Sequence, residues 1–229
     1  MADEPVLVIT GASSGIGAAT ARRGAEFGYR LALAARSEEK LDALVEELGA
    51  DRAIAVKCDV TSWEEQQALV ATTLERLGRM DVFFANAGFG GARSFLGDSV
   101  EHWKAMIDTN VLGAALSIRA SLPHFKEQNR GHILLTGSVA GRRNFPGSLY
   151  GATKWAVSAI GENLRQEVAE TDVKVTLIEP GMTDTPFFDN RPQGALEADD
   201  IARAVMFALT QPPHVDVNEV LIRPVHQPH

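Results

Sequence analysis

The sequence has little of several features that would assign it to a special class of protein. Its 229 residues contain a single cysteine, Cys58, so no disulfide can form within the chain and nothing indicates a disulfide-stapled secreted scaffold. No apolar run approaches the roughly 18 residues of a membrane span, and the acidic start is unlike a basic secretion signal. Lys and Arg number 22 against 30 Asp and Glu, a net charge of -8, which leaves no broad basic face for nucleic acid. We therefore expect a soluble cytoplasmic protein that binds neither nucleic acid nor membrane.

Metal ligands are also sparse. Cys58 has no ligand partner near it in the sequence, and His226 and His229 lie in a Pro-rich tail. We expect no metal site and a solvated tail.

Short apolar segments alternate with longer amphipathic segments along the whole chain, without a linker, a repeat or a block of charge. The apolar segments are continuous rather than alternating, as in parallel strands covered on both faces. The predicted strands are Val6–Thr10, Arg30–Ala35, Ala53–Cys58, Val82–Ala85, His132–Gly137, Val173–Glu179 and Glu219–Ile222. The predicted helices are Gly15–Gly28, Ser37–Leu48, Ser62–Leu77, Val100–Gln128, Ser148–Thr171 and Glu197–Thr210. This order predicts an α/β fold with one doubly wound parallel sheet of about seven strands and helices on both faces.

Some helix ends are marked by capping residues. Ser62 lies where an N-cap is expected, and Glu65 follows it as in a capping box. Gly28, Gly49 and Gly78 follow predicted helix ends, where glycine is favoured.

A glycine-rich turn links the first predicted strand to the first helix, with the sequence Thr10-Gly11-Ala12-Ser13-Ser14-Gly15-Ile16-Gly17. Glycines permit a tight turn and close approach of a pyrophosphate, which the positive end of a helix dipole favours. The spacing G-x-x-x-G-x-G differs from the commoner G-x-G-x-x-G but meets the same mechanical need. A glycine-rich turn without a ligand is the alternative, and the strand–turn–helix context favours a dinucleotide site in a single-domain Rossmann fold.

The second predicted strand ends at Ala35-Arg36, at about the 20-residue distance where the adenosine ribose is recognised. A carboxylate there would bind the 2′-hydroxyl of NAD, whereas an arginine suits the 2′-phosphate of NADP. Ala35 and Arg36 supply a cation and no carboxylate, and Ser13 adds a hydroxyl. The pattern favours NADP(H), with a solvated strand-end arginine as the alternative.

These motifs, with others later in the chain, resemble the short-chain dehydrogenase/reductase family across nearly the whole sequence. The further matching positions are Asp59, Asn86-Ala87-Gly88, Asn110, Ser138, Tyr150-x-x-x-Lys154 and Pro180-Gly181. The resemblance implies a single domain over residues 1–229, with a cofactor-binding part at about 5–110 and a catalytic and substrate part at about 111–229. It implies that Asp59 accepts a hydrogen bond from the adenine amino group. The residues then expected at the cofactor are Gly11, Ser13, Ser14, Gly15, Ile16, Gly17, Arg36, Asp59, Val60, Asn86, Ala87, Gly88, Tyr150, Lys154, Pro180, Gly181, Thr183 and Thr185.

Tyr150 and Lys154 are four residues apart on a predicted helix and therefore share one face. A tyrosine with a pKa near 10 is a poor acid–base catalyst at neutral pH, and an adjacent ammonium lowers that pKa. Ser138 ends a predicted strand, where its hydroxyl can donate to a carbonyl oxygen. The family resemblance implies that Tyr150 protonates the carbonyl, Ser138 polarises it, Lys154 binds the nicotinamide ribose, and Asn110 holds a water that links Lys154 to solvent.

The sequence therefore predicts an NADP(H)-dependent oxidoreductase that interconverts a carbonyl and a primary or secondary alcohol by hydride transfer. A catalytically silent NADP-binding regulator on the same fold is the alternative, although it would not need Ser138, Tyr150, Lys154 and Asn110 together. A dehalogenase-like lyase would need a disrupted glycine loop and another residue at Lys154, and neither is present.

The substrate is less well specified. The predicted pocket has apolar walls from Phe89, Phe95, Phe145, Phe187 and Phe188. Four arginines are candidates for a bidentate clamp on a substrate carboxylate, with a solvated surface or a subunit interface as alternatives: Arg93, Arg142, Arg143 and Arg191. Three segments are similar to the NADP-dependent branch of the family that acts on 3-hydroxy acids and serine: Met106–Asn110, Ile178–Gly181 and Arg223–Val225. The short segment after Pro180-Gly181 instead favours an open pocket and broad tolerance of ketones and aldehydes.

The family resemblance also implies a homodimer or homotetramer that associates through the long helices carrying Asn110 and Tyr150. Core packing is the alternative explanation for several of the apolar residues on those helices, namely Val111, Leu112, Ala115, Leu116, Ala156, Val157 and Ile160.

Overall fold

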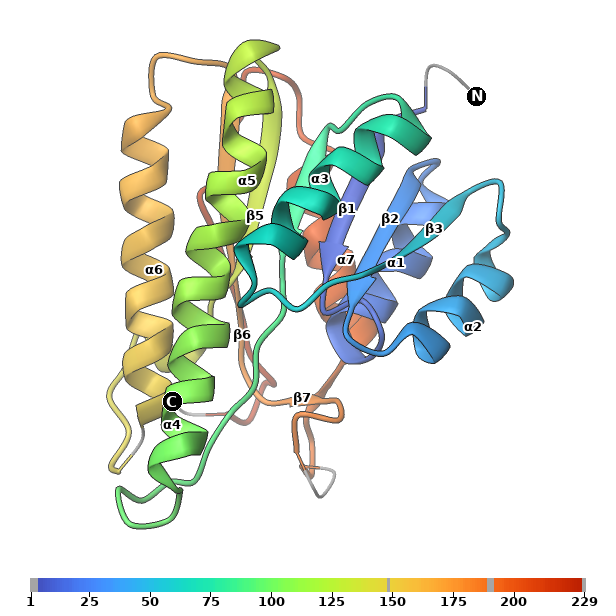
Figure 1. Ribbon diagram of the computed structural model, residues 1–229. Coiled ribbons are helices and arrows are strands. Elements are labelled where there is room, and N and C mark those ends of the chain that lie inside the picture. The colour runs from blue at the N-terminus through green and yellow to red at the C-terminus, as the bar shows by residue number, and fades with distance from the viewer. Residues whose placement is uncertain (1–3, 148, 189–191, 228–229) are drawn as a thin grey trace.

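The computed structural model describes residues 4–147, 149–188 and 192–227 (Figure 1). Its main sheet has seven strands, all paired in parallel, in the order β3-β2-β1-β4-β5-β6-β9. The strands are β1 (Val6–Thr10), β2 (Arg30–Ala35), β3 (Ala53–Lys57), β4 (Val82–Ala85), β5 (Gly131–Thr136), β6 (Val173–Pro180) and β9 (Glu219–Ile222). The predicted doubly wound sheet is confirmed. Its direction of winding reverses between β1 and β4, and a crevice for a ligand forms at the carboxyl ends of strands at such a point.

Helices cover both faces of the sheet, as predicted. One face packs against α3 (Trp63–Leu77), α5 (Gly113–Glu127) and α6 (Leu149–Glu167). The other packs against α1 (Gly15–Glu26), α2 (Glu38–Leu48) and α7 (Ala198–Leu209). In Figure 1, α5 and α6 run side by side along one edge of the molecule.

The continuous apolar character of the strands follows from this double cover. In β1, Val6 and Val8 belong to the core beneath α3, α5 and α6, whereas Leu7 and Ile9 belong to the core beneath α1, α2 and α7. All four side chains are fully buried. Because successive strand residues point to opposite faces, both sets must be apolar when neither face meets water.

The predicted helix Val100–Gln128 is confirmed as continuous helical backbone from Val100 to Glu127, but a π-helical turn within it was not predicted. The helix α4 (Val100–Ile107) runs into a π-helical turn, Asp108–Leu112, before α5 begins. A π-helical turn widens the helix locally and is frequent at functional sites. Here it carries Asn110, whose side chain is held by the loop after β4. A tertiary contact, rather than a helix-breaking residue, accompanies the π-helical turn.

The predicted helix ends are largely confirmed. Gly28, Gly49 and Gly78 adopt φ angles of +83°, +95° and +74°. Ser62 accepts a hydrogen bond from the backbone N–H of Glu65 at 3.2 Å. The capping box is wrong in its second half, since the Glu65 carboxylate accepts from the backbone N–H of Asp59 instead. Serine 148, the predicted start of α6, lies outside the described residues.

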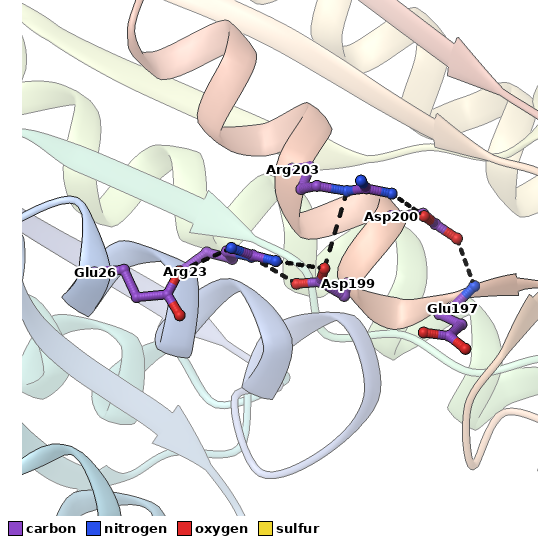
Figure 2. A network of polar contacts seen from close by, with 6 residues as sticks. All are labelled: Arg23, Glu26, Glu197, Asp199, Asp200 and Arg203. Atoms are coloured by element: carbon purple, nitrogen blue, oxygen red, sulfur yellow. Dashed lines mark hydrogen bonds and ion pairs between the residues drawn. The ribbon is translucent and has the colours of Figure 1, made fainter.

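A second, two-stranded sheet was not predicted. It pairs β7 (Thr183–Asp184) with β8 (Leu196–Glu197), just before α7. Figure 2 shows how the start of α7 is joined to α1: the Arg23 guanidinium donates to both Asp199 oxygens at 2.7 Å. Glu197 and Asp200 form a capping box at the same helix end. The segment that follows β6 therefore returns to a point fixed against α1, the helix that follows the glycine-rich turn.

Candidate active site

A cleft of about 870 Å³ lies at the carboxyl ends of the central strands, a volume in the usual range for a small-molecule site. These are the lower ends of the strands in Figure 1, near β7. Most of the residues predicted from the sequence line it: Gly11, Ser13, Ser14, Gly15, Ile16, Arg36, Asp59, Val60, Asn86, Ala87, Gly88, Ser138, Tyr150, Lys154, Pro180, Gly181, Thr183 and Thr185. Gly17 and Asn110 are not among the residues that line the cleft.

The glycine-rich turn depends on its glycines for two reasons. Gly11 and Gly15 have φ angles of +65° and +52°, which other residues adopt with strain. A Cβ on Gly17 would lie 2.3 Å from the backbone oxygen of Gly11, so the helix could not pack so close to the turn. The Ser14 side chain does not cap α1, although Ser14 is its N-cap residue. This leaves the amino end of the helix directed at the cleft, as a diphosphate requires.

The opposite end of the cleft is positively charged where the adenosine ribose is expected. Arg36 lines it, as predicted, and the structure adds Lys40 from the first turn of α2. Partial burial raises the pKa of Asp59, but hydrogen bonds from Thr61 and the charge of Arg36 outweigh it and hold that pKa below its usual value. The sequence carried a signal for Lys40, since it follows Arg36 by one helical turn. Two cations at this end fit a phosphate group on the ribose.

Asn86 holds the centre of the cleft together. Its side-chain Nδ2 donates to the Thr10 carbonyl at 3.0 Å, and its Oδ1 accepts from the Thr136 hydroxyl at 3.0 Å. The side chain thus links the ends of β1, β4 and β5, which carry the glycine loop and the segment before Ser138.

Ser138, Tyr150 and Lys154 meet in one wall of the cleft. Ser138 follows β5, and its hydroxyl lies near enough to the Tyr150 phenol to lower the pKa of that phenol. The Lys154 ammonium donates to the Thr136 carbonyl at 2.7 Å and lies 5.7 Å from the centre of the Tyr150 ring. A strand end and one face of α6 therefore bring a hydroxyl, a phenol and an ammonium into one group.

The ionisation of this group differs from the sequence-based expectation. Burial raises the pKa of Tyr150 to about 12, while the Ser138 hydroxyl acts in the opposite direction. Burial lowers the pKa of Lys154 to about 8. The Lys154 ammonium is directed at the Thr136 carbonyl, and the net rise in the Tyr150 pKa comes from burial of the phenol. The phenol is thus held as a proton donor at neutral pH.

Asn110 is buried in the π-helical turn with its amide fully engaged. Its Oδ1 accepts from the Phe89 N–H at 3.0 Å, and its Nδ2 donates to the Phe89 carbonyl at 2.9 Å and to the Thr153 hydroxyl at 3.1 Å. Thr153 precedes Lys154 on α6, so Asn110 ties the loop after β4 to the helix that carries Tyr150. Its expected water-holding role stays a prediction.

The candidate substrate arginines separate into different surroundings. Arg93 lines the cleft. The Arg142 guanidinium instead donates from Nε to both oxygens of Glu179, at 2.7 and 2.8 Å, and pairs with Glu219. The cleft-lining residues do not include Arg143, which is exposed. Arg191 lies outside the described residues. The proposed clamp by Arg142 is therefore wrong, because two carboxylates of the protein already hold its charge.

Glu179 is a functional candidate that sequence reasoning missed. Its side chain is fully buried, and burial raises its pKa while Arg142 acts against that rise. The Ser158 hydroxyl of α6 also donates to it at 3.2 Å. Glu179 thus joins the end of β6, α6 and the 3-10 turn Val139–Gly141 that follows Ser138. The sequence did carry a signal, because Glu179 is an acidic residue at the end of a predicted strand that is otherwise mostly apolar.

The tail is not entirely solvated as expected. Gln227 lines the cleft, and its Oε1 accepts from the Met182 N–H at 2.8 Å. His226 is exposed, and His229 lies outside the described residues. Within the described part of the chain, no group of three or more His, Cys, Asp or Glu side chains is placed to hold a metal ion. No described helix is long and apolar enough to cross a membrane.

Comparison with known proteins agrees with this geometry. Residues 5–195 match the family model for short chain dehydrogenases, and the chain belongs to the short-chain dehydrogenase/reductase family. It is 42% identical over 224 residues to an uncharacterized oxidoreductase of Staphylococcus haemolyticus, covering 96% of this chain and 97% of that protein.

Two solved structures are similarly close. An alcohol dehydrogenase from the archaeon Thermococcus sibiricus, complexed with 5-hydroxy-NADP, is 36% identical, with a TM-score of 0.91 over 97% of both chains. Serine dehydrogenase from Escherichia coli is 34% identical, with a TM-score of 0.90 over 98% of this chain and 100% of that chain.

Proposed function

We propose that this protein is an NADP(H)-dependent oxidoreductase that interconverts a carbonyl group and a primary or secondary alcohol by hydride transfer. The observation that carries the proposal is the meeting of Ser138, Tyr150 and Lys154 in the wall of a cleft that begins at the glycine-rich turn. The complex of the Thermococcus sibiricus alcohol dehydrogenase with 5-hydroxy-NADP supports it.

The cofactor would lie along the cleft, with its diphosphate at Gly11–Gly17 and its adenosine end near Arg36 and Asp59. When bound, it supplies or accepts the hydride. Gly88, Pro180, Gly181, Thr183 and Thr185 line the part of the cleft expected to hold the nicotinamide half.

The protein's own groups supply the proton and the orientation. In reduction, the carbonyl oxygen would accept hydrogen bonds from the Ser138 hydroxyl and the Tyr150 phenol, so that developing negative charge is stabilised. Tyr150 then gives its proton to that oxygen, and hydride with proton completes the alcohol. Lys154 provides a positive charge beside the phenolate that remains. In oxidation the same steps run in reverse.

A catalytically silent NADP-binding regulator remains the alternative. The grouping of Ser138, Tyr150 and the buried Lys154 in one cleft wall argues against it, because cofactor binding alone gives no reason to place a phenol beside a serine and a buried lysine. A regulator would bind NADPH and consume none with any carbonyl.

For the cofactor, exchanging Ala35 for Asp and Arg36 for Leu should shift the preference toward NAD(H). Loss of a charge-assisted contact with the 2′-phosphate costs roughly 1.5–3 kcal/mol, so kcat/KM for NADPH should fall about 10- to 100-fold. Steady-state kinetics with both cofactors measures the change, and Lys40→Ala should shift it in the same direction. An unchanged NADPH-to-NADH ratio in the double variant would remove Arg36 from this role.

For the substrate, we propose a 3-hydroxy or 3-oxo acid, or a broad range of ketones and aldehydes. Similarity to a serine dehydrogenase supports the first. Of the candidate arginines, Arg93 lines the cleft, where it could bind a substrate carboxylate. Consumption of NADPH should be compared among 3-oxo acids, aldehydes, ketones and diketones, and of NADP+ with 3-hydroxy acids. Absence of oxidation with every 3-hydroxy acid would exclude that class.

A further inference from the structure

The part of the cleft beyond Ser138 and Tyr150 has aromatic walls, and one ring lies directly against the tyrosine. The centres of the Phe187 and Tyr150 rings are 5.3 Å apart with an interplanar angle of 62°, an edge-to-face contact. The Phe188 ring packs against Phe187 in the same manner at 5.0 Å. Phe187 therefore occupies space immediately beside the phenol that we assign to proton transfer.

Phe187 also reaches the opposite wall of the cleft. A Cβ added to Gly90 would lie 2.4 Å from the Phe187 Cζ atom, so the ring rests on bare backbone of the loop after β4. That loop is fixed from α4, because the His102 ring is within hydrogen-bond distance of the Gly90 carbonyl at 3.0 Å and packs edge-on against Phe89 at 5.2 Å. The ring thus bridges the segment after β7 and the loop after β4.

The Phe187 ring is held in place without being locked there. Its residue is 40% exposed, although it touches Tyr150, Phe188 and Gly90. Burying a whole phenylalanine side chain contributes about 1.5–3 kcal/mol, and a ring this exposed gains only part of that. A bulky substrate group can displace the ring, and the cost of displacement then counts against its binding.

We propose that Phe187 determines substrate size, limiting the group carried next to the reacting carbonyl. The inference rests on the proposed carbonyl reduction and narrows its substrate class to compounds with a small group on the Phe187 side. A longer chain on that side would overlap the ring between Tyr150 and Gly90. Phe188 packs against Phe187 and should have a smaller influence on the size of the substrate group that binds.

Two symmetric diketones test this, because both carbonyls of each molecule carry the same substituent. Butane-2,3-dione carries methyl groups and octane-4,5-dione carries propyl groups. The Phe187→Ala variant should raise the propyl-to-methyl ratio of kcat/KM by about tenfold or more, since each methylene in an apolar pocket changes discrimination by roughly that factor. Phe187→Leu should give an intermediate ratio, and the matched control Phe188→Ala should change it less than about threefold.

The ratio of the dissociation constants of the two diketones should shift in the same direction when they bind without reacting. Calorimetry of the two diketones with the NADP+-loaded protein gives dissociation constants for a dead-end complex, in which no hydride is available. If no protein turns over either diketone but the binding ratio shifts with Phe187, the size limit stands. The proposed reaction fails separately, if no carbonyl compound in the screen consumes NADPH. Equal ratios in the unmodified protein and Phe187→Ala, an equal shift in Phe188→Ala, or no binding of either diketone would overturn the size limit.

Discussion

At the scale of single residues, the site rests on a buried ion pair behind the catalytic group. Glu179 and Arg142 join the end of β6 to the 3-10 turn Val139–Gly141. Ser138 is the N-cap of that turn, and its hydroxyl also accepts from the Ala140 N–H at 3.1 Å. A substitution of Arg142 should therefore alter the position of Ser138, although Arg142 does not line the cleft.

Replacing Arg142 with Ala should destabilise the fold by about 3 kcal/mol, because it leaves the buried Glu179 carboxylate without a charged partner and with only the Ser158 hydroxyl donating to it. In the fraction that folds, poorer positioning of Ser138 should raise the activation free energy by about 1.4 kcal/mol, which lowers kcat about tenfold. The dissociation constant of NADPH should change little. Arg142→Lys should recover part of kcat, and exposed Arg143→Ala is the control. Urea unfolding and steady-state kinetics measure these effects, and a loss of NADPH binding with unchanged kcat would contradict the positioning role.

Several residue roles could be predicted from the sequence, and others could not. The glycine loop, Arg36, Ser138, Tyr150 and Lys154 lie within short motifs, so their chemistry and spacing predicted a shared site. Glu179, Gln227 and the contact between Phe187 and Gly90 could not be predicted, because each depends on segments far apart in the chain. The pKa of Tyr150 also differs from expectation, since burial of the phenol raises it and burial depends on the tertiary structure.

At the scale of elements, the strands were the most predictable, and the π-helical turn within a long helix was the least. A strand covered on both faces must be apolar at every position, which leaves a clear sequence signal. The π-helical turn at Asp108–Leu112 breaks no helical pattern, and its cause lies in the contact between Asn110 and Phe89. The strands β7 and β8 have two residues each, too few for any periodicity.

The pairing of β5 with β6 contains a buried titratable group, which makes a pH-dependent prediction possible. His132 of β5 forms a hydrogen bond with the Thr176 hydroxyl of β6 at 2.7 Å, and burial lowers its pKa to about 3. An unfolded histidine titrates near pH 6.5, so His132 favours the folded state fully above that pH. This contribution is lost progressively as the pH falls from about 6.5 toward 3.

The free energy of unfolding should therefore drop by about 2 kcal/mol between pH 7.5 and pH 5 on account of this residue alone. Urea unfolding of the protein and of His132→Gln, which cannot titrate, isolates the difference. An NMR titration of the His132 ring in the unmodified protein gives a second measurement should the variant not fold. A ring that titrates above pH 6 would contradict the assignment.

At the scale of the whole molecule, the predicted self-association rests on apolar side chains left at the surface. Ile107, Leu112 and Trp155 are 42%, 47% and 44% exposed on α4, the π-helical turn and α6. Val157, which was assigned to the same face, belongs to the core. The exposed residues lie on the helices at one edge of the molecule, where a second copy could cover them (Figure 1).

We expect a dimer or tetramer in solution, and Leu112→Glu should shift it toward the monomer by placing a charge in an apolar contact. Light scattering and sedimentation of the purified protein measure the mass. Phe207→Glu is the matched control, because Phe207 is 54% exposed on α7, on the other face of the sheet. A monomer mass for the unmodified protein refutes self-association, and dissociation by Phe207→Glu alone would place the interface on α7.

The central claim is that Tyr150 delivers the proton in an NADPH-dependent carbonyl reduction. The most direct measurement compares the unmodified protein with Tyr150→Phe, which lacks only the phenolic hydroxyl. NADPH binding is followed by fluorescence, and turnover by loss of reduced-nicotinamide absorbance with a carbonyl substrate found in the screen. The account predicts that the variant binds NADPH with nearly unchanged affinity and loses about 10²- to 10⁴-fold in kcat, the usual contribution of a positioned acid. Turnover that survives in Tyr150→Phe at the unmodified rate would contradict it.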